Sequence, residues 1–347
     1  MKPERLAVLI ERFSSRRIVV LGDFFLDKYL HVDPELSELS VETGKTAHQV
    51  VAVRHSPGVA GTVVGNLAAL GAKTLHAIGF TGDDGEGYDL RRDLARLNCS
   101  TDRLYQSSDR MTPTYLKPRD KSVPGLAGEH NRYDTKNRTP AQTALIEQMI
   151  AALDALLASV DAVIIADQVE YPDCGVVTSV MRTALAERAL KNPDIIFWAD
   201  SRTNIRHFRN VIIKPNQFEA VGWENPVPGD TVSMEDLRAI IIRLRQTVNG
   251  PICVTCGAAG MMVSDPEPIV VRSVHVDDPI DITGAGDSAT AGAVLALASG
   301  ATLPEAALLG NLVASITIQQ LNTTGVARPD QLPPQLELWR AQEDRTQ

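Results

Sequence analysis

Short runs of β-branched and other apolar residues alternate with longer segments of helical periodicity along most of the chain. This alternation is typical of parallel β-α-β units, whose strands are covered by helices on both faces. We expect strands at 18–21, 75–80, 162–166, 195–199, 211–213 and 251–255. We expect helices at 63–70, 85–97, 141–159, 175–190, 234–248, 285–299 and 304–320, with a short surface helix near 1–13. The sequence therefore predicts an α/β fold with a doubly wound, mostly parallel sheet flanked by helices.

Two stretches, residues 29–57 and 105–140, interrupt this alternation. Long irregular insertions in a compact domain usually carry function. We predict that the two insertions pair into a small β lid; the alternative is a pair of surface loops without a role. The 347 residues, 44% of them hydrophobic, suffice for one large domain with an appendage. We expect that domain to span 1–340 and a polar tail to follow at 341–347.

Charge and cysteine content narrow the class of protein. A formal net charge of -9 argues against nucleic-acid or anionic-membrane partners, because both require a basic surface. Residues 1–13 interleave charged with apolar side chains, unlike a signal peptide. Four cysteines in such a chain indicate the reducing cytoplasm. Cys253 and Cys256 form a CxxC in a predicted strand, where residues three apart point to opposite faces, so we interpret them as structural.

Residues 281–288, DITGAGDS, run directly into a predicted helix. Glycines allow a tight turn that aims backbone N–H groups at an anion, and the helix start adds its positive dipole end. Gly284, Ala285 and Gly286 are therefore predicted to bind a transferring phosphate, with Asp287 within reach of the acceptor hydroxyl. We expect the helix start to lower the pKa of Asp287, which would then mainly orient the acceptor. The alternative is a packing turn in which Asp287 is only a helix cap.

This segment closely resembles the C-terminal signature of the ribokinase-like, or PfkB, carbohydrate kinases, and the resemblance extends over most of the chain. It implies a ribokinase-like fold and transfer of the ATP γ-phosphate to a sugar hydroxyl, with Mg²⁺ as cofactor. It also implies that Asp287 is the catalytic base. Asp281 becomes a candidate site for a monovalent cation such as K⁺.

Residues 22–27, GDFFLD, look like the family's N-terminal substrate motif, in which the first Asp, here Asp23, holds sugar hydroxyls. A carboxylate suits this role because it accepts two hydrogen bonds from a vicinal diol. Asp27, in the same motif, is a further substrate-binding candidate. Asp167, at the end of the predicted strand 162–166, faces the expected crevice and is another. From the residues alone, a turn with a capping Asp is the alternative for Asp23.

Residues 57–71 resemble the family's first signature, a Gly-Gly turn leading into a helix. Gly58 matches, whereas Val59 stands where the second glycine is usual. Thr62 stands where an asparagine normally contacts the sugar, and its hydroxyl has a shorter reach. We keep Gly58 and Thr62 as substrate-binding candidates, and the departures leave open whether sugar binding is altered or lost. Asn66 is equally compatible with helix packing.

Residues 214–219, KPNQFE, resemble the family's NxxE motif. The resemblance implies that Asn216 and Glu219 tune nucleotide and Mg²⁺ binding, Glu219 through water. Mg²⁺ keeps several waters and takes few protein ligands, which fits such a role. A helix cap at Asn216 with Glu219 completing a capping box is compatible with it.

A second nucleotide segment, residues 254–261, resembles the strand and glycine turn that flank the nucleotide in this family. A polar residue and a close-approach glycine at a strand end suit an α/β ligand crevice, so Thr255 and Gly257 are nucleotide-binding candidates. Asn311 falls in the region that lines the adenine pocket in relatives. A structural asparagine is the alternative there.

Residues 131–134 and 200–202 also resemble segments of this family. The chain is most similar to the heptose-phosphate kinase subgroup, in which lid residues help to hold a sugar phosphate. Lys117, Arg119 and Arg132 are candidates for that contact, since Arg matches phosphate geometry in a bidentate way. Solvated loop charges are the alternative. The expected substrate is a sugar or sugar phosphate, with a heptose 7-phosphate-like compound as one candidate. A homodimer through the lid, common in relatives, is a candidate assembly.

Other function classes fit these patterns less well. A catalytically silent relative that senses a sugar or nucleotide stays open because of Val59 and Thr62, as does a nucleoside kinase. A dinucleotide-dependent oxidoreductase would need GxGxxG after an early strand, where this chain has GDFF. The histidines show no HxH or HExxH spacing typical of metallohydrolases. We expect no nucleotidyltransferase domain with an HxGH motif, since the chain ends soon after the prolines at 333–334.

Overall fold

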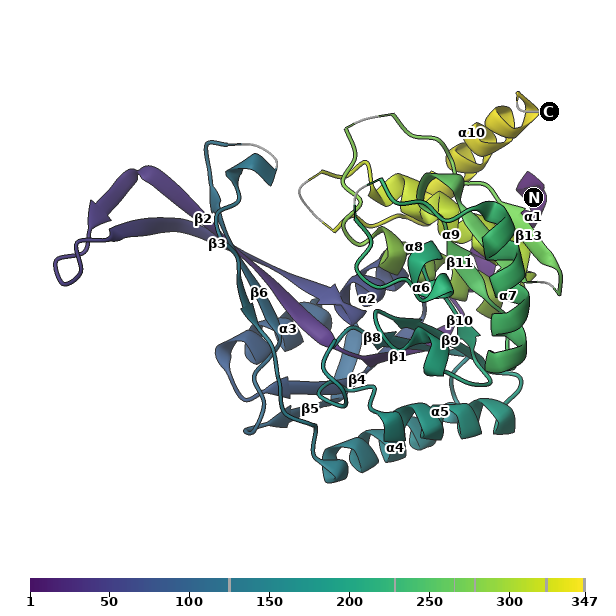
Figure 1. The fold of residues 1–347 in the computed structure, drawn as a ribbon, viewed down its shortest axis with the longest axis horizontal. Coiled ribbons are helices and arrows are strands. Elements are labelled where there is room, and N and C mark those ends of the chain that lie inside the picture. Colours follow the sequence, from purple (N-terminus) through teal and green to yellow (C-terminus); the bar gives the residue numbers. More distant parts are fainter. Residues whose placement is uncertain (124–125, 228, 265, 278, 322–323, 346–347) are drawn as a thin grey trace.

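The computed structural model describes residues 1–123, 126–227, 229–264, 266–277, 279–321 and 324–345. Its central sheet has six parallel strands in the order β10-β9-β8-β1-β4-β5 (Figure 1). These strands are β1 (Arg17–Gly22), β4 (Thr74–Gly82), β5 (Cys99–Ser107), β8 (Ala162–Asp167), β9 (Ile196–Ser201) and β10 (Ile212–Ile213). The predicted α/β fold with a parallel sheet is confirmed.

Helices cover both faces of this sheet (Figure 1). In β1, Ile18 and Val20 enter one apolar core, and Val19 and Leu21 enter the other. The first core also receives α1 (Pro3–Phe13), α2 (Ala60–Ala69), α3 (Gly85–Arg96), α8 (Ala285–Ala298), α9 (Leu303–Thr317) and α10 (Leu332–Asp344). The second receives α4 (Thr143–Leu157), α5 (Ser179–Lys191), α6 (Gln217–Val221) and α7 (Met234–Val248). Among the described residues, no helix is long and apolar enough to cross a membrane.

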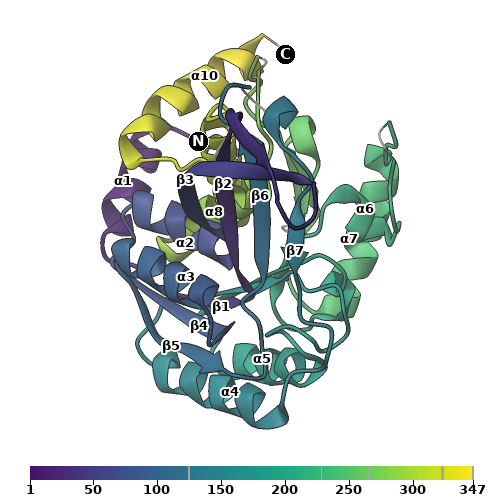
Figure 2. The same ribbon diagram turned by 90° about the vertical axis from the view of Figure 1, so that its left-hand side faces the viewer.

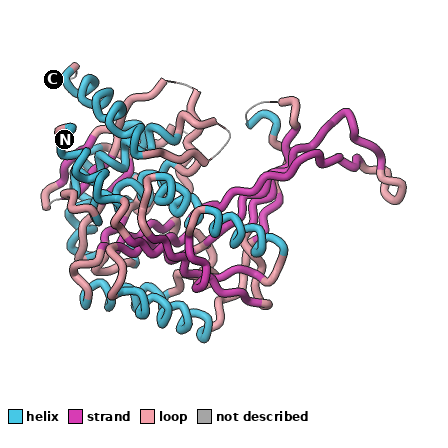
Figure 3. Tube along the Cα trace, turned by 180° about the vertical axis from the view of Figure 1, so that it is seen from behind, coloured by secondary structure: helices cyan, strands magenta, loops and turns pink. Residues whose placement is uncertain are grey.

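The two insertions form a separate four-stranded sheet, ordered β3-β2-β6-β7, which stands beside the core (Figure 2). Its strands are β2 (Phe24–Leu39), β3 (Thr46–Val59), β6 (Thr114–Asp120) and β7 (Tyr133–Thr135). The predicted β lid is thus confirmed, although residues 124–125 of the second insertion lie outside the described part. Only Asp23 separates β2 from β1, so the chain passes directly from the central sheet into the lid. The β2–β3 hairpin projects far from the body (Figure 3).

The alternation of side chains gives the lid sheet two distinct faces. Across the strands, Asp27 pairs with Tyr115 of β6, and Tyr29 pairs with Lys117. These four side chains therefore share one face, while the intervening Lys28 lies on the other and forms an ion pair with Glu86 of α3 at 2.8 Å. The first of these faces gathers the polar groups discussed below, and we call it the inner face.

The structure differs from the sequence prediction at three places. The strand at 253–255 (β11, Cys253–Thr255) joins β12 (Met261–Ser264) and β13 (Pro268–Val271) in a small antiparallel sheet rather than the central one. The helix expected from 175 begins at Ser179. The side chain of Thr178 caps this end, and the carboxylate of Asp173 accepts the N–H of Ser179 at 2.6 Å. Residues 341–344, expected in a polar tail, complete α10, and 346–347 lie outside the described residues.

The cysteine interpretation agrees with the structure. All four cysteines are buried and unpaired as thiols. Cys253 enters the first apolar core and Cys256 the second, so they point to opposite faces of the chain.

Gly22, at the end of β1, sets how closely two central strands approach. A Cβ added there would lie 2.1 Å from the carbonyl oxygen of Ala166 in β8. We therefore expect Gly22→Ala to lower the free energy of unfolding by about 1–3 kcal/mol, because the backbone of β1 or of β8 must move. Urea denaturation measures this. Gly85→Ala, whose Cβ meets open space, serves as control, and equal midpoints for the two variants would contradict the prediction.

Candidate active site

The glycine turn and the start of α8 have the geometry predicted for an anion site. Gly284 has φ +76°, and a Cβ on it would lie 3.2 Å from Cγ2 of Thr62, so both conformation and space require glycine. In the first turn of α8, the N–H of Ala285 donates to the carbonyl of Ile282 at 3.1 Å, and the first intrahelical bond runs from Ser288 to Gly284 at 2.9 Å. The N–H groups of Gly286 and Asp287 precede that bond and so have no partner within the helix. Asp281 accepts a hydrogen bond from the N–H of Thr283 at 3.0 Å, which shapes the turn. A cation at Asp281 stays a prediction.

Sequence reasoning missed a buried lysine that lies against this turn. Lys214 follows β10, its side chain is 5% exposed, and its Nζ lies 2.8 Å from Oδ2 of Asp200 at the end of β9. A Cβ on Gly286 would lie 3.5 Å from the same Nζ, so the ammonium borders the glycine turn. Burial alone would lower the pKa of Lys214, but the carboxylates around it raise the pKa, so the ammonium remains charged. Its place after a strand and before the NxxE motif was the available signal.

The expectation of a lowered pKa for Asp287 was wrong. Burial, followed by the charge of Asp200, raises the pKa of Asp287 to about 7; Asp27 adds to the rise, and Lys214 opposes it. The helix start is thus outweighed by desolvation and by like charges. Asp287 is consequently a carboxylate with the proton affinity of a base near neutral pH, instead of a weak one.

On the inner face of the lid, Asp27 comes closest to this centre. Its Oδ1 lies 2.6 Å from Nζ of Lys117, which also approaches the Tyr29 hydroxyl at 3.4 Å. Gly58 lies behind it, and a Cβ there would be 2.7 Å from Oδ2 of Asp27. Gly58 thus makes room for the carboxylate. At the base of the lid, Ser56 Oγ of β3 lies 3.2 Å from Oγ1 of Thr324, and a Cβ on Gly284 would lie 3.4 Å from Cγ2 of the same threonine, so the lid adjoins the glycine turn.

Asp23, the first Asp of the motif, has another task. Its carboxylate accepts the backbone N–H groups of Gln168, Val169 and Val176 at 2.8, 3.1 and 2.8 Å, and the residue is 3% exposed. These contacts hold the loop after β8. Both oxygens of Asp23 thus already accept backbone N–H groups, and its contact with a sugar stays a prediction.

Asp167 is likewise turned inward. It is 3% exposed and accepts hydrogen bonds from Ser201 Oγ at 2.7 Å and from Asn204 Nδ2 at 3.2 Å. Burial, followed by the nearby charge of Asp23, raises the pKa of Asp167 to about 7. The expected contact of Asp167 with sugar hydroxyls is therefore not available in this arrangement.

The two departures in the first signature have different consequences. Val59 has a backbone conformation that favours glycine, with φ +56°, which is rare for a β-branched residue. Thr62 is 5% exposed, and its hydroxyl donates to the carbonyl of Pro57 at 3.4 Å. Thr62 thus packs beneath Gly284. Asn66 is fully buried and donates to the carbonyls of Thr62 and Gly325, as a packing residue would.

The two lid cations differ in their surroundings. Lys117 is paired with Asp27 next to the centre, whereas the half-exposed Arg132 forms an ion pair with Asp134 at 2.7 Å. The guanidinium of Arg132 also lies over the ring of Tyr115, 4.5 Å from its centroid. Both side chains belong to the inner face, so both are oriented toward the space between lid and core. Arg119 is 7% exposed, within the lid.

On the nucleotide side, the predicted capping box is confirmed. Asn216 Oδ1 accepts the N–H groups of Phe218 and Glu219, and Glu219 Oε2 accepts the N–H of Asn216 at 2.7 Å. Burial, and then the charge of Asp200, raises the pKa of Glu219 to about 7. One oxygen of Glu219 remains outside the capping box. The residue is therefore both a structural element and part of the acidic surroundings of Lys214.

The carboxylates of Asp200, Glu219 and Asp287 fit a Mg²⁺ ion that keeps most of its water. All three influence Lys214 electrostatically. In the part of the chain that is described, no three His, Cys, Asp or Glu side chains converge closely enough to hold a metal directly. Mg²⁺ dehydrates reluctantly and commonly binds through one or two carboxylates and substrate phosphates, so a dispersed acidic set suits it.

The remaining nucleotide candidates lie around the small antiparallel sheet. Thr255 ends β11, next to Asn216 in a parallel bridge, and Gly257 has φ +55° with open space where a Cβ would be. These two residues border the same region as the NxxE segment. Asn311 instead donates to the carbonyls of Val271 and Arg272 at 2.9 and 3.1 Å, which ties α9 to the end of β13. These contacts fit the structural role that was the alternative to a place in the adenine pocket for Asn311.

Comparison with known proteins agrees with this arrangement. Residues 16–330 match the model of the pfkB family carbohydrate kinases. The Bifunctional protein HldE of Caulobacter vibrioides is 30% identical over 326 residues, which cover 92% of this chain and 63% of that protein. The Bifunctional protein HldE of Gluconacetobacter diazotrophicus is 27% identical over 90% of this chain and 62% of its own length. The chain therefore spans less than two thirds of these curated relatives.

Solved structures share the fold. Ribokinase from Thermotoga maritima superposes with a TM-score of 0.65 at 17% identity, covering 93% of this chain and 99% of the other. Phosphofructokinase-2 from Escherichia coli in complex with fructose-6-phosphate gives a TM-score of 0.64 at 19% identity, covering 94% and 99%. The chain belongs to the pfkB family of carbohydrate kinases, phosphotransferases with an alcohol group as acceptor.

Proposed function

We propose that this chain transfers the γ-phosphate of ATP to a hydroxyl of a sugar phosphate, with a heptose 7-phosphate-like compound as acceptor. The observation that carries the proposal is that the buried ammonium of Lys214 borders the glycine turn that leads into Asp287, while Asp27 is near enough to raise the pKa of Asp287. A base, a fixed cation and a sugar-facing carboxylate are the groups that phosphoryl transfer to an alcohol requires.

Each group has a defined task. The N–H groups at the start of α8 and the ammonium of Lys214 offset charge on the transferring phosphoryl oxygens. Asp287 orients the acceptor hydroxyl and accepts its proton. We transfer the expected contact with sugar hydroxyls from Asp23 to Asp27, because Asp27 lies on the inner face beside Gly58. Glu219 would hold Mg²⁺ through water, and the bound ion would supply further neutralisation of phosphate charge.

The acceptor class follows from the inner face of the lid. Lys117 and Arg132 place two cations on the side that faces the glycine turn. A neutral sugar has no need for them, whereas a phosphorylated sugar does. The departure at Thr62, whose hydroxyl is used internally, agrees with an acceptor that is held by charge more than by that side chain.

The decisive experiment measures ADP release with ATP and Mg²⁺ across a panel that contains a heptose 7-phosphate, ribose, fructose and nucleosides. We expect the phosphorylated heptose to give the highest kcat/KM. Turnover restricted to nucleosides would assign a nucleoside kinase instead. No turnover with any acceptor, together with saturable ligand binding, would establish the sensing role.

The raised pKa of Asp287 predicts a pH profile. Because the base must be unprotonated, kcat/KM should rise about tenfold per pH unit below pH 7 and level off above the pKa of about 7. The folded-state pKa lies above the usual value, so the loss of activity begins near neutrality instead of near pH 4. Initial rates between pH 5 and 9 test this, with Glu147→Gln as a variant that should keep the profile. A flat profile down to pH 5 would contradict it.

We further propose a homodimer through the lid. The projecting β2–β3 hairpin exposes apolar side chains, among them Val51 at 48% and Val53 at 51%. We expect the double variant Val51→Lys, Val53→Lys to convert a dimer to a monomer in sedimentation velocity. Val180→Lys on α5, 53% exposed, is the control and should leave the mass unchanged. A wild-type monomer at high concentration would exclude this assembly.

The buried thiols agree with a reducing, cytoplasmic location.

A further inference from the structure

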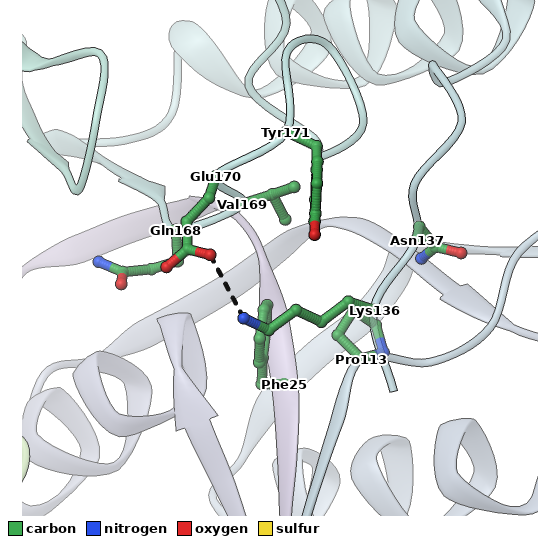
Figure 4. A pocket seen from close by; sticks show the side chains of 8 residues that line it. All are labelled: Phe25, Pro113, Lys136, Asn137, Gln168, Val169, Glu170 and Tyr171. Carbon is green, nitrogen blue, oxygen red and sulfur yellow. Dashed lines mark hydrogen bonds and ion pairs between the residues drawn. The ribbon is translucent and has the colours of Figure 1, made fainter. Parts of the chain in front are cut away.

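A narrow hollow lies between the lid and the loop that follows β8 (Figure 4). Phe25, Pro113, Lys136 and Asn137 line it from the lid side, and residues 168–171 line it from the core side. Phe25 belongs to the inner face and contacts Tyr115, with ring centroids 5.2 Å apart. The hollow therefore continues the space that contains Asp27 and Lys117.

One carboxylate bridges two cations across this hollow. Glu170 Oε2 lies 3.4 Å from Nζ of Lys136, the contact drawn in Figure 4. Its other oxygen lies 3.1 Å from Nε of Arg202, just beyond β9. A single side chain of the loop thus holds a lysine from the lid and an arginine from the core. Neither the phosphate turn nor the proposed chemistry uses any of the three.

The base of the loop is fixed, whereas the bridge is weak. Three backbone N–H groups, those of Gln168, Val169 and Val176, are held by the buried carboxylate of Asp23. Glu170 is presented from this fixed base, yet its side chain is 41% exposed and that of Arg202 is 56% exposed. Ion pairs with such exposure contribute only about 0–1 kcal/mol each. The bridge can therefore be displaced at little cost.

A phosphate group competes well for the same cations. A phosphomonoester carries about -1.5 to -2 charges at pH 7 and three acceptor oxygens, against a single charge on a carboxylate. It also forms bidentate, charge-assisted hydrogen bonds with a guanidinium. Both Lys136 and Arg202 act electrostatically on Tyr115, which carries Arg132 over its ring, so all three cations border one region.

We propose that Glu170 is an internal placeholder for the phosphate of the acceptor: it bridges Lys136 and Arg202 until an acceptor's phosphomonoester displaces it and takes both cations. The proposal rests on the proposed function and adds to it a specificity device. Displacement also releases the loop from the lid, which couples entry of a phosphorylated acceptor to the position of both. A neutral sugar leaves the bridge in place.

The kinetic test compares a heptose 7-phosphate with the same heptose lacking the phosphate. Glu170→Gln removes the competing charge and keeps the shape, so KM for the phosphorylated acceptor should fall about three- to tenfold while KM for the neutral one stays unchanged. Arg202→Met and Lys136→Met should raise KM for the phosphorylated acceptor alone, by about tenfold. Glu147→Gln, an equal change of charge on the exposed face of α4, should alter neither. A rise of both KM values in Glu170→Gln would make the bridge a structural latch and overturn the proposal.

A binding measurement separates this proposal from the kinase assignment. In calorimetric titration with inorganic phosphate, Glu170→Gln should bind about three- to tenfold more tightly than the wild type, and Arg202→Met should lose that binding. This result would support the placeholder even if no sugar were turned over. Phosphate binding that persists unchanged in Arg202→Met and in Lys136→Met would lie elsewhere and would refute it, whatever the kinase activity.

Discussion

Asp287→Asn is expected to reduce kcat by about 10²–10⁴-fold while the affinity for ATP stays within a few-fold of the wild type. The carboxylate acts on the proton of the acceptor, and the amide that replaces it keeps the size of the side chain but cannot take up that proton. ATP contacts are expected from the N–H groups of the turn and from Lys214, which this substitution leaves in place.

The measurement pairs initial rates of ADP release with calorimetric titration of ATP·Mg²⁺. Asp330→Asn, which removes the same charge from a residue whose side chain is 70% exposed, is the control and should behave as the wild type. Because burial, followed by the charge of Asp200, disfavours the ionised form of Asp287 and raises its pKa, the neutral variant is also expected to fold without loss of stability. A large loss of ATP affinity with a small change in kcat would show that Asp287 serves the nucleotide, and the assignment as base would be wrong.

Lys214→Met is expected to lower both activity and stability. Loss of one preorganised donor at a developing oxyanion costs about 10²–10³-fold in kcat. The substitution also leaves Asp200 without its partner beside Glu219 and Asp287. Breaking a buried ion pair costs about 3–5 kcal/mol of unfolding free energy, so the melting temperature should fall clearly.

A double variant separates the two effects of Lys214→Met. Lys214→Met with Asp200→Asn removes both charges of the pair and should recover much of the lost stability. It should not recover activity, since the cation at the glycine turn is still missing. Thermal denaturation and ADP release are measured on the wild type, on Lys214→Met and on the double variant to separate the two effects. Recovery of activity in the double variant would mean that Lys214 acts only through folding.

Local patterns in the sequence were sufficient for the elements of the core and for the phosphate turn. The helix that spans 234–248 has the predicted bounds, since Ser233 caps one end and Asn249, with φ +55°, closes the other. The glycine turn at 284–286 likewise requires only local conformation. The lid strands were predicted as a pair of insertions without their lengths, because β2 and β3 are stabilised mainly by each other and their polar residues hide the period of two.

Motif resemblance identified the segments of the site more reliably than the roles within them. Both acids of GDFFLD were named, yet only the fold separates them. Asp23 meets three backbone N–H groups of a loop some 145 residues away, whereas Asp27 lies on the inner face of the lid and pairs with Lys117. Alternation of side chains does not explain this difference, because residues four apart on one strand would share a face. Asp23 lies between β1 and β2, beside the loop after β8, so its surroundings depend on that distant segment.

The sequence by itself determined most strands and helices of the core, the glycine turn before α8 and the position of Asp287 in its first turn, because these follow from local periodicity and backbone conformation. Only the tertiary structure decided that Lys214 borders that turn, that Asp27 instead of Asp23 faces it, and that Glu170 joins lid to core. The pKa of Asp287 belongs to this second group. Burial and the approach of carboxylates from other segments raise it to about 7, and the helix start, the one local influence, predicted the opposite direction.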